Sequence, residues 1–256
     1  MPPIEANQFN STLIARTMIT DHVLQLTFKR ADHQLLDFVP GQFITFLLPD
    51  ESGKPVRRSY SLANSPGSPF FEVAVAPVGG GFATQILFNL KVGDQLLTTG
   101  PKGQLTLKAT DQTTHYLLVA TNTGVAPYRS MLPTIIHRLE SQEALKVTLL
   151  LGVCYAKDLL YAADFLALDA TYEKFNFRGY LSRETNFTLP YHYKGYVQEA
   201  FSTVDLDPSS AIVYLCGNPH MVDESVKLLE VMGFSAEQLR REKYISSKAL
   251  ASPRTA

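Results

Sequence analysis

The periodicity of the chain changes near residue 110, and this change restricts the folds that are open to it. Before that point, short β-rich runs alternate with turns such as Pro40-Gly41 and Gly93-Asp94, a pattern typical of an all-β barrel or sandwich. After it, apolar runs alternate with segments of helical period, which indicates a parallel sheet with crossover helices. With 256 residues, 45% of them hydrophobic, the chain is long enough for two cores. We therefore predict two domains, an antiparallel β-barrel over residues 1–110 and an α/β domain with a parallel sheet over residues 111–256.

The individual elements follow from the same patterns. The first half predicts six strands, at Thr12–Thr17, Val23–Phe28, Phe43–Leu48, Arg58–Leu62, Phe70–Val78 and Gln95–Thr99, and one helix, Phe82–Leu90. The second half predicts strands at Tyr116–Thr121, Lys146–Gly152, Phe175–Leu181 and Ala211–Cys216. Helices are expected at Ala126–Leu139, Asp158–Leu168, Gly195–Phe201 and Pro219–Met232.

Charge and composition argue against several classes of protein. The net charge is −1, so no basic excess points to nucleic acid. No apolar run reaches the roughly 18–20 residues of a membrane span, and the N-terminus lacks the basic and apolar regions of a secretory signal, so we expect a cytoplasmic protein. Cys154 and Cys216 are the only cysteines, so the chain cannot supply four thiolates to an iron–sulfur cluster, and no metal site is expected.

The segment 56–64 combines cations, an aromatic ring and small hydroxyl groups. Because it is expected to be a strand, Arg58 and Tyr60 share one face and Ser59 and Ser61 share the other. A guanidinium group suits a phosphate, and a phenol ring suits stacking on a flat heterocycle. These are the groups that a ligand with both a phosphate and a flat ring requires.

Three glycines, at positions 79–81, open the helix that is predicted to begin at Phe82. Backbone N–H groups at a helix N-terminus attract anions, and glycines let a phosphate approach them closely. Thr84 would add a hydroxyl donor to a pyrophosphate. A flexible glycine loop that only caps a surface helix fits the same residues, and the segment alone does not decide between the two readings.

Two turns in the second half follow predicted strands. Asn122, Thr123 and Gly124 lie after the first of them, where folds of this kind bind nucleotide phosphates. The turn is not a GxGxxG fingerprint, and Asn122 is a residue that tolerates the left-handed backbone region. Cys216 and Gly217 follow the last central strand, where a buried, inert cysteine is the common alternative to a functional one.

The type of nucleotide follows from the residues after the third strand of this half. A 2′-phosphate requires cations and hydroxyl groups, whereas a free ribose prefers a carboxylate. No Asp or Glu ends the strand, and Ser182, Arg183 and Lys194 offer donors instead, which favours NADP(H) over NAD(H). An ordinary exposed ion pair between Arg183 and its neighbour Glu184 is the alternative. Tyr196 and Gln198 have the chemistry to stack on adenine and to hydrogen-bond it.

Taken in order, these motifs resemble those of the ferredoxin/flavodoxin–NADP(+) reductase family, of bacterial type, over nearly the whole chain. The resemblance is carried by Arg58-x-Tyr60-Ser61, Gly80-Gly81-x-x-Thr84, the turn 120–127, Ser182-Arg183, Lys194-x-Tyr196-x-Gln198 and Cys216-Gly217-x-Pro219-x-Met221. The order of the motifs is much harder to obtain by chance than any one of them.

The resemblance implies a flavoprotein that carries FAD in the barrel and NADP(H) in a nucleotide-binding α/β domain. We expect a monomer, although the motifs do not specify the oligomeric state. A hydride would pass between the nicotinamide and flavin N5, and single electrons would pass to or from ferredoxin or flavodoxin. It implies that Ser61 bonds near N5, that Cys216 borders the hydride path and that Glu242 is a polar group near the nicotinamide. The residues implied in cofactor binding are Arg58, Ser59, Tyr60, Ser61, Val73, Ala74, Val75, Gly80, Gly81, Phe82, Ala83, Thr84, Thr123, Gly124, Ser182, Arg183, Lys194, Tyr196, Gln198, Gly217 and Tyr244.

Two other functions are compatible with this chain. An NAD(P)H-dependent flavin reductase, or the reductase component of an oxygenase, would use the same cofactors with a different acceptor. A non-catalytic flavin-binding subunit for electron transfer belongs to a different class, and the NADP motifs argue against it.

Overall fold

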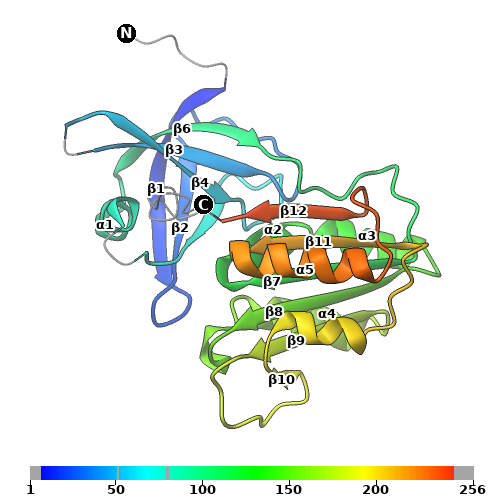
Figure 1. Cartoon of the computed structure of the whole chain (residues 1–256). Coiled ribbons are helices and arrows are strands. Elements are labelled where there is room, and N and C mark those ends of the chain that lie inside the picture. The colour runs from blue at the N-terminus through cyan, green and yellow to red at the C-terminus, as the bar shows by residue number, and fades with distance from the viewer. Residues whose placement is uncertain (1–6, 51, 79–80, 245–256) are drawn as a thin grey trace, which may run out of the picture. The chain divides into compact units, whose positions relative to one another are not determined.

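The computed structural model describes residues 7–50, 52–78 and 81–244. The chain forms two compact units (Figure 1). Among the described residues, one comprises those up to 107 together with 126–133, and the other comprises 108–125 and 134–244. The short helix α2, Ala126–Ser130, therefore belongs to the first unit although it follows the first strand of the second.

The first unit is built on six antiparallel strands. They are β1 (Gln8–Met18), β2 (Leu24–Arg30), β3 (Phe43–Pro49), β4 (Pro55–Ser61), β5 (Phe71–Val75) and β6 (Gln95–Lys102), in the spatial order β4-β3-β6-β1-β2-β5. A β-bridge between Leu62 and Val73 joins the two outer strands, so the sheet closes on itself. The antiparallel barrel predicted for this half of the chain is confirmed.

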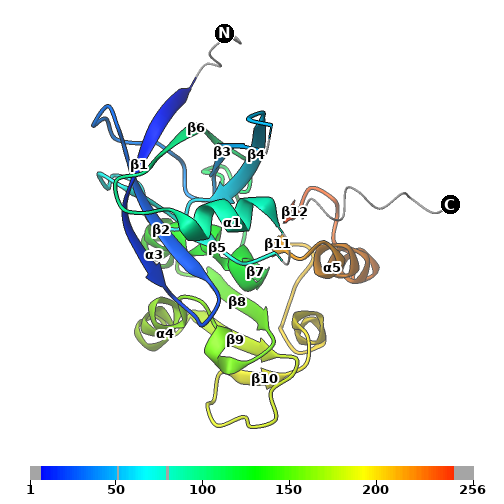
Figure 2. The ribbon, with the colours of Figure 1, turned by 90° about the vertical axis from the view of Figure 1, so that its left-hand side faces the viewer.

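Alternation of side chains fills the barrel. In β2, for example, Leu24, Leu26 and Phe28 are buried while the residues between them are half-exposed. Helix α1, Phe82–Asn89, packs beside the strands and adds Ala83 and Leu87 to the same core (Figure 2).

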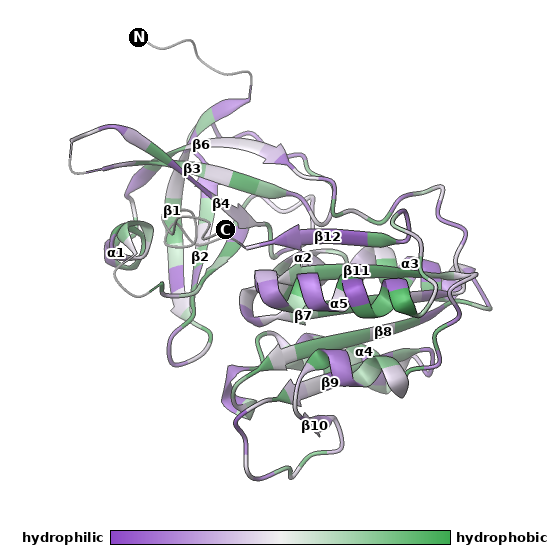
Figure 3. Ribbon diagram, in the orientation of Figure 1, coloured by the Kyte–Doolittle hydropathy of each residue, from purple (hydrophilic) through white to green (hydrophobic). Residues whose placement is uncertain are grey.

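The second unit is a six-stranded parallel sheet. Its strands are β7 (His115–Thr121), β8 (Lys146–Val153), β9 (Phe175–Leu181), β10 (His192–Lys194), β11 (Ala211–Gly217) and β12 (Leu239–Lys243), in the order β10-β9-β8-β7-β11-β12. The central strands β7, β8 and β11 are buried on both faces and are accordingly hydrophobic along most of their length (Figure 3). The parallel α/β architecture is therefore also confirmed.

Helices cover both faces of this sheet. Helices α3 (Leu132–Ser141) and α4 (Ala162–Thr171) lie on one face, and α5 (Pro219–Val231) lies on the other with the 3₁₀ segment η3 (Val197–Ser202) (Figure 2). Two further 3₁₀ turns are η1 (Asn122–Val125) and η2 (Ala156–Asp158).

Three predicted helices differ from the structure for local reasons. The helix predicted over 126–139 is divided into α2 and α3 near Met131, because Pro133 has no N–H to continue the ladder. The helix predicted to begin at Asp158 begins at Ala162, because Tyr161 adopts a left-handed backbone with φ 56°. The segment predicted as a helix from Gly195 is the 3₁₀ segment η3, and β10 just before it was not predicted.

Candidate functional site

In the first unit, strand β4 carries the predicted flavin residues. The ring of Tyr60 lies 5.7 Å from that of Phe46, centroid to centroid, and burial raises the pKa of Tyr60 to about 12. The phenol therefore stays neutral and presents a fixed, half-buried ring. Ser61 is buried, and the Ser59 hydroxyl lies 2.9 Å from Oγ1 of Thr45 on the neighbouring strand.

Arg58 lies on the same strand face as Tyr60, two residues before it. Its Nη1 donates to the carbonyl of Arg57 at 2.7 Å. Among the described residues, no carboxylate forms an ion pair with Arg58, so its positive charge is available to a phosphate.

The N-terminus of α1 has the features of an anion site. The cap residue is Gly81, no side chain caps the helix, and its first turn holds no acidic residue. A Cβ on Gly81 would lie 2.7 Å from the carbonyl oxygen of Val78, so only glycine fits there without a shift. The Val78 N–H donates to Oγ1 of Thr84 at 3.0 Å, which fixes the entry to the helix.

The remaining predicted flavin residues divide into two groups. Val73, Ala74 and Val75 of β5 are buried and pair with β2. Ala83 is buried and Phe82 packs on the barrel core. Gly80 lies outside the described residues.

The sequence did not predict the side chains that form hydrogen bonds and an ion pair around residues 63–72, just after Ser61. Nη1 of Arg129, in α2, lies 2.7 Å from Oε2 of Glu72 and 3.1 Å from the carbonyl oxygen of Ala63. The Asn64 side chain donates to the carbonyl of Phe70 and accepts from the N–H of Glu72. Since Arg129 and Glu72 are far apart in sequence, no local pattern could have paired them.

In the second unit, the turn after β7, which the sequence predicts to bind a phosphate, packs closely against the end of β11. Asn122 has φ 48°, the left-handed conformation that its residue type tolerates. A Cβ on Gly217 would lie 2.8 Å from the carbonyl oxygen of Thr121, and a Cβ on Gly124 would overlap the carbonyl of Cys216. Both positions therefore require glycine. Thr123, which is half-buried, lies in sequence between Thr121, which contacts Gly217, and Gly124, which contacts Cys216.

Three predicted residues gather at the carboxyl ends of β11 and β12. Cys216 and Glu242 are register partners, and the Tyr244 N–H donates to the carbonyl of Gly217 at 2.8 Å. Complete burial raises the pKa of the Cys216 thiol well above its ordinary value, the charge of Glu242 raises it further, and a hydrogen bond with Tyr244 opposes both. The thiol is therefore neutral near pH 7 and acts by packing rather than as a nucleophile.

The predicted 2′-phosphate residues lie at the carboxyl ends of β9 and β10. Lys194 is the register partner of Leu181, so Ser182 and Arg183 leave the sheet beside it. The carboxylate of Glu184 accepts the N–H groups of Ala156 and Thr185, and these backbone hydrogen bonds lower its pKa. Among the described residues, no carboxylate forms an ion pair with Arg183, so the alternative pair with Glu184 is not formed.

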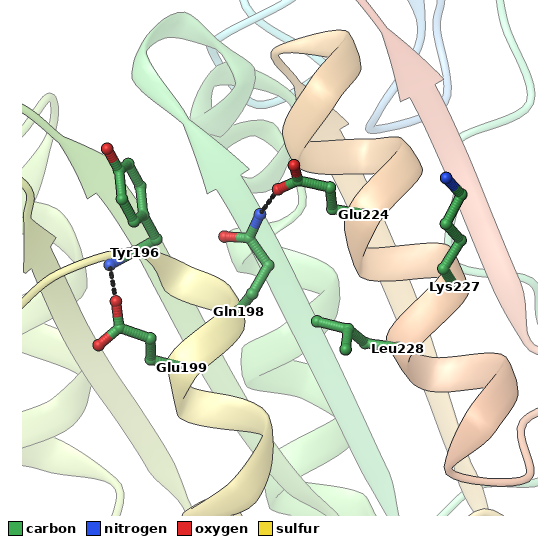
Figure 4. A pocket seen from close by; sticks show the side chains of 6 residues that line it. All are labelled: Tyr196, Gln198, Glu199, Glu224, Lys227 and Leu228. Atoms are coloured by element: carbon green, nitrogen blue, oxygen red, sulfur yellow. Dashed lines mark hydrogen bonds between the residues drawn. The ribbon is translucent and has the colours of Figure 1, made fainter.

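Tyr196 and Gln198 line a pocket of about 400 Å³. Figure 4 shows its other wall, which α5 supplies. Tyr196 is 65% exposed, which is high for an aromatic residue and suits stacking on a flat ring. The residues that line the pocket are Tyr196, Gln198, Glu199, Glu224, Lys227 and Leu228, of which only the first two were predicted.

The described part of the chain lacks both a membrane-spanning helix and a cluster of metal ligands. No helix there is both long and apolar enough to cross a membrane. No group of three or more His, Cys, Asp or Glu residues there could hold a metal ion.

Comparison with known proteins follows the division into two units. Residues 10–107 match the family of the oxidoreductase FAD-binding domain, and residues 118–227 match that of the oxidoreductase NAD-binding domain. Ferredoxin–NADP reductase B of Sorangium cellulosum is 35% identical over 181 residues, which are 70% of this chain and 72% of that protein.

Two further relatives are named for a dioxygenase and for a cytochrome P450. The electron transfer component of toluate 1,2-dioxygenase from Pseudomonas putida is 26% identical, over 90% of this chain and 65% of that protein. The crystal structure of the Amycolatopsis cytochrome P450 reductase GcoB superposes with a TM-score of 0.81 at 28% identity, over 93% of this chain and 69% of that one. The chain thus spans about two thirds of the length of these two relatives.

Proposed function

The chain belongs to the ferredoxin/flavodoxin–NADP(+) reductase family, and we propose that it exchanges electrons between NADP(H) and a one-electron carrier protein, ferredoxin or flavodoxin. It is an oxidoreductase with an FAD-binding and an NAD(P)-binding domain. FAD, when bound, supplies the step between two-electron hydride chemistry and single-electron transfer. The protein's part is to bind, orient and shield the reacting rings.

The observation that best supports NADP(H) is the donor set beside β9 and β10. Ser182, Arg183 and Lys194 place a hydroxyl and two cations at one edge of the sheet. The carboxylate of Glu184, beside Arg183, accepts backbone N–H groups instead, and that of Glu199, which lies against Gly195, accepts the N–H of Tyr196. A phosphate is the ligand group that this arrangement suits.

The residues of the first unit fit FAD. Arg58 has no ion-pair partner among the described residues, and the uncapped N-terminus of α1 offers N–H groups to a pyrophosphate. The neutral ring of Tyr60 provides a flat surface for the isoalloxazine, and buried Ser61 provides a hydroxyl beside it. In the second unit, Cys216 and Glu242 would border the nicotinamide, with Glu242 holding a polar atom toward it.

A second candidate function is that of an oxygenase reductase component. It is favoured by the relatives that serve a dioxygenase and a cytochrome P450. Both functions use the same cofactors. They differ only in the protein that accepts the electrons from the reduced flavin.

The proposal is tested by adding NADPH anaerobically to the FAD-loaded protein and following the visible flavin band, then adding oxidised ferredoxin or flavodoxin. We expect bleaching by NADPH and recovery of the band when a carrier is added. Bleaching with recovery only on addition of free flavin would favour a flavin reductase. Absence of bleaching with either nicotinamide would contradict the proposal.

Replacing Ser61 with alanine should slow reduction of the flavin by NADPH about ten-fold, because one hydrogen bond near the reacting atoms is lost. FAD content should stay the same, since Arg58 and α1 carry the phosphate contacts. Stopped-flow absorbance measures the rate, and the flavin-to-protein absorbance ratio measures the content.

The matched control for this variant is Ser11→Ala. Ser11 is another buried barrel serine, and its hydroxyl is bonded to Oγ1 of Thr98 at 2.7 Å. It should cost stability without changing the reduction rate. Equal rates for Ser61→Ala and the unmodified protein would remove Ser61 from the mechanism.

A further inference from the structure

The segment that follows Ser61 closes the barrel of the first unit, and residues 61–64 are called the closure segment below. Ser61 is the last residue of β4 and pairs with Phe43 of β3. The next residue, Leu62, forms its β-bridge with Val73 of β5 instead. The chain therefore changes its pairing partner directly after the residue whose hydroxyl the proposed function places beside the flavin.

Hydrogen bonds hold the closure segment on β5. The N–H of Ala63 donates to the carbonyl of Glu72 at 2.8 Å. The N–H of Glu72 in turn donates to Oδ1 of Asn64 at 2.8 Å. Ala63 and Asn64 are both buried, so these bonds are shielded from water. They fix the segment to one neighbouring strand.

Arg129 of α2 links the closure segment to a further element of the same unit, which includes residues 126–133. Its Nη1 donates to Oε2 of Glu72 at 2.7 Å and to the carbonyl of Ala63 at 3.1 Å. The side chains of Arg129 and Glu72 are 25% and 14% exposed, so salt screens this pair less than it screens a surface pair. A single guanidinium nitrogen thus joins α2 both to β5 and to the closure segment.

Loss of this guanidinium would act first on the backbone of the closure segment. The carbonyl of Ala63, a fully buried residue, would lose a charge-assisted donor, and Glu72 would keep a largely buried charge. Both changes favour a shift of the segment toward other donors. Ser61 lies two residues before that carbonyl, and misplacement of a group at a reaction site by about 1 Å can lower a rate about 100-fold.

From this arrangement we infer that Arg129 is a positioning residue for flavin reduction, which acts through Ser61 by fixing the closure segment. The inference rests on the proposed function, because that function gives the Ser61 hydroxyl its place near the reacting flavin atom. Arg129 itself need not touch a cofactor. Its effect on the reduction rate therefore depends on the presence of the hydroxyl at position 61.

A double-mutant cycle tests this dependence. The FAD-loaded unmodified protein, Ser61→Ala, Arg129→Gln and the double variant are each reduced by NADPH in anaerobic stopped-flow experiments, and their FAD content is measured. Arg129→Gln should lower the limiting rate about ten-fold, as Ser61→Ala does, and change the apparent Kd for NADPH by no more than about two-fold. The double variant should be within about two-fold of the slower single variant, because no hydroxyl is left to position. Arg129→Lys should recover the rate to within about three-fold, since one ammonium nitrogen can donate to both acceptors.

The matched control is Arg30→Gln, which removes a guanidinium from another ion pair of the same unit. Arg30 pairs with Asp32 at 2.6 Å and ends β2, a strand that is not a neighbour of β4 in the sheet. It should keep the reduction rate of the unmodified protein.

Several outcomes would overturn the inference and leave the proposed function intact. One is a double variant in which the two effects multiply to about 100-fold, as independent effects do. Another is an unchanged rate in Arg129→Gln or in Ser61→Ala. Loss of FAD from Arg129→Gln would also overturn it, because Arg129 would then support the fold or the cofactor in general. If NADPH fails to bleach the flavin of the unmodified protein, the proposed function fails and the inference fails with it.

Discussion

Replacing Arg183 with alanine should raise the KM for NADPH about 10- to 100-fold and change the KM for NADH by no more than about two-fold. The expected size is that of charge-assisted hydrogen bonds to one phosphate. Arg183 follows β9 beside Lys194, and among the described residues it has no carboxylate partner to lose. The substitution should therefore affect only a ligand that carries a 2′-phosphate. Steady-state kinetics with both nucleotides, followed through an artificial electron acceptor, measures the two constants.

A matched control is Lys174→Ala. Lys174 is an exposed cation at the opposite end of the same strand, where it donates to the carbonyl of Glu143. It tests whether the loss of one positive charge anywhere on the unit weakens NADPH binding through the long-range field. Equal increases in KM for NADPH and NADH in Arg183→Ala would end the assignment of Arg183 to the 2′-phosphate.

Features that depend on neighbours in sequence were predictable. The alternation that places Arg58 and Tyr60 on one strand face is a property of any extended chain, and it persists in β4. The left-handed φ of Asn122 follows from the preference of asparagine for that region, and the structure shows it. Lys194 and Ser182 were grouped by their residue types, and the parallel pairing of β9 with β10 brings them together.

Features that depend on pairing across the chain were not predictable. The Arg129–Glu72 ion pair joins a helix to a strand of the barrel, and nothing near either residue indicates its partner. The α5 wall of the pocket arises because a helix late in the chain packs on η3. Glu224 and Lys227 look like ordinary exposed helix residues until that packing is known.

The same limitation applies to a buried ion cluster in the second unit. Asp111, whose side chain is 4% exposed, pairs with Arg240 of β12 and accepts the hydroxyl of Tyr116 at 3.0 Å. Arg138 lies 3.9 Å from the same carboxylate and donates to the carbonyl of Lys108 at 2.7 Å. The cluster links Asp111, near the start of the second unit, to Arg138 of α3 and to Arg240 of β12, the edge strand that also carries Glu242.

Asp111→Ala should lower the stability of this unit by about 3–5 kcal/mol, because two largely buried guanidinium groups would lose their counter-charge. For a protein of this size the melting temperature should fall by about 10 °C or more. Differential scanning calorimetry measures the change. The control is Asp32→Ala, which breaks a comparable pair with Arg30 at an exposed position and should leave the melting temperature nearly unchanged.

The pH dependence of this loss tests its electrostatic origin. Burial tends to raise the pKa of Asp111, but the hydrogen bonds and charge of Arg240 outweigh it and hold the pKa below its ordinary value. A carboxylate with a depressed pKa in the folded state stabilises the fold above its unfolded pKa, about 4, and this contribution disappears as the pH falls below it. The stability difference between the unmodified protein and Asp111→Ala should therefore shrink below about pH 4. In addition, Asp111→Ala combined with Arg240→Met should cost less than the sum of the two single changes, because the double variant no longer leaves the Arg240 charge buried without a partner. An additive cycle together with a pH-independent difference would show that Asp111 contributes by shape rather than by charge.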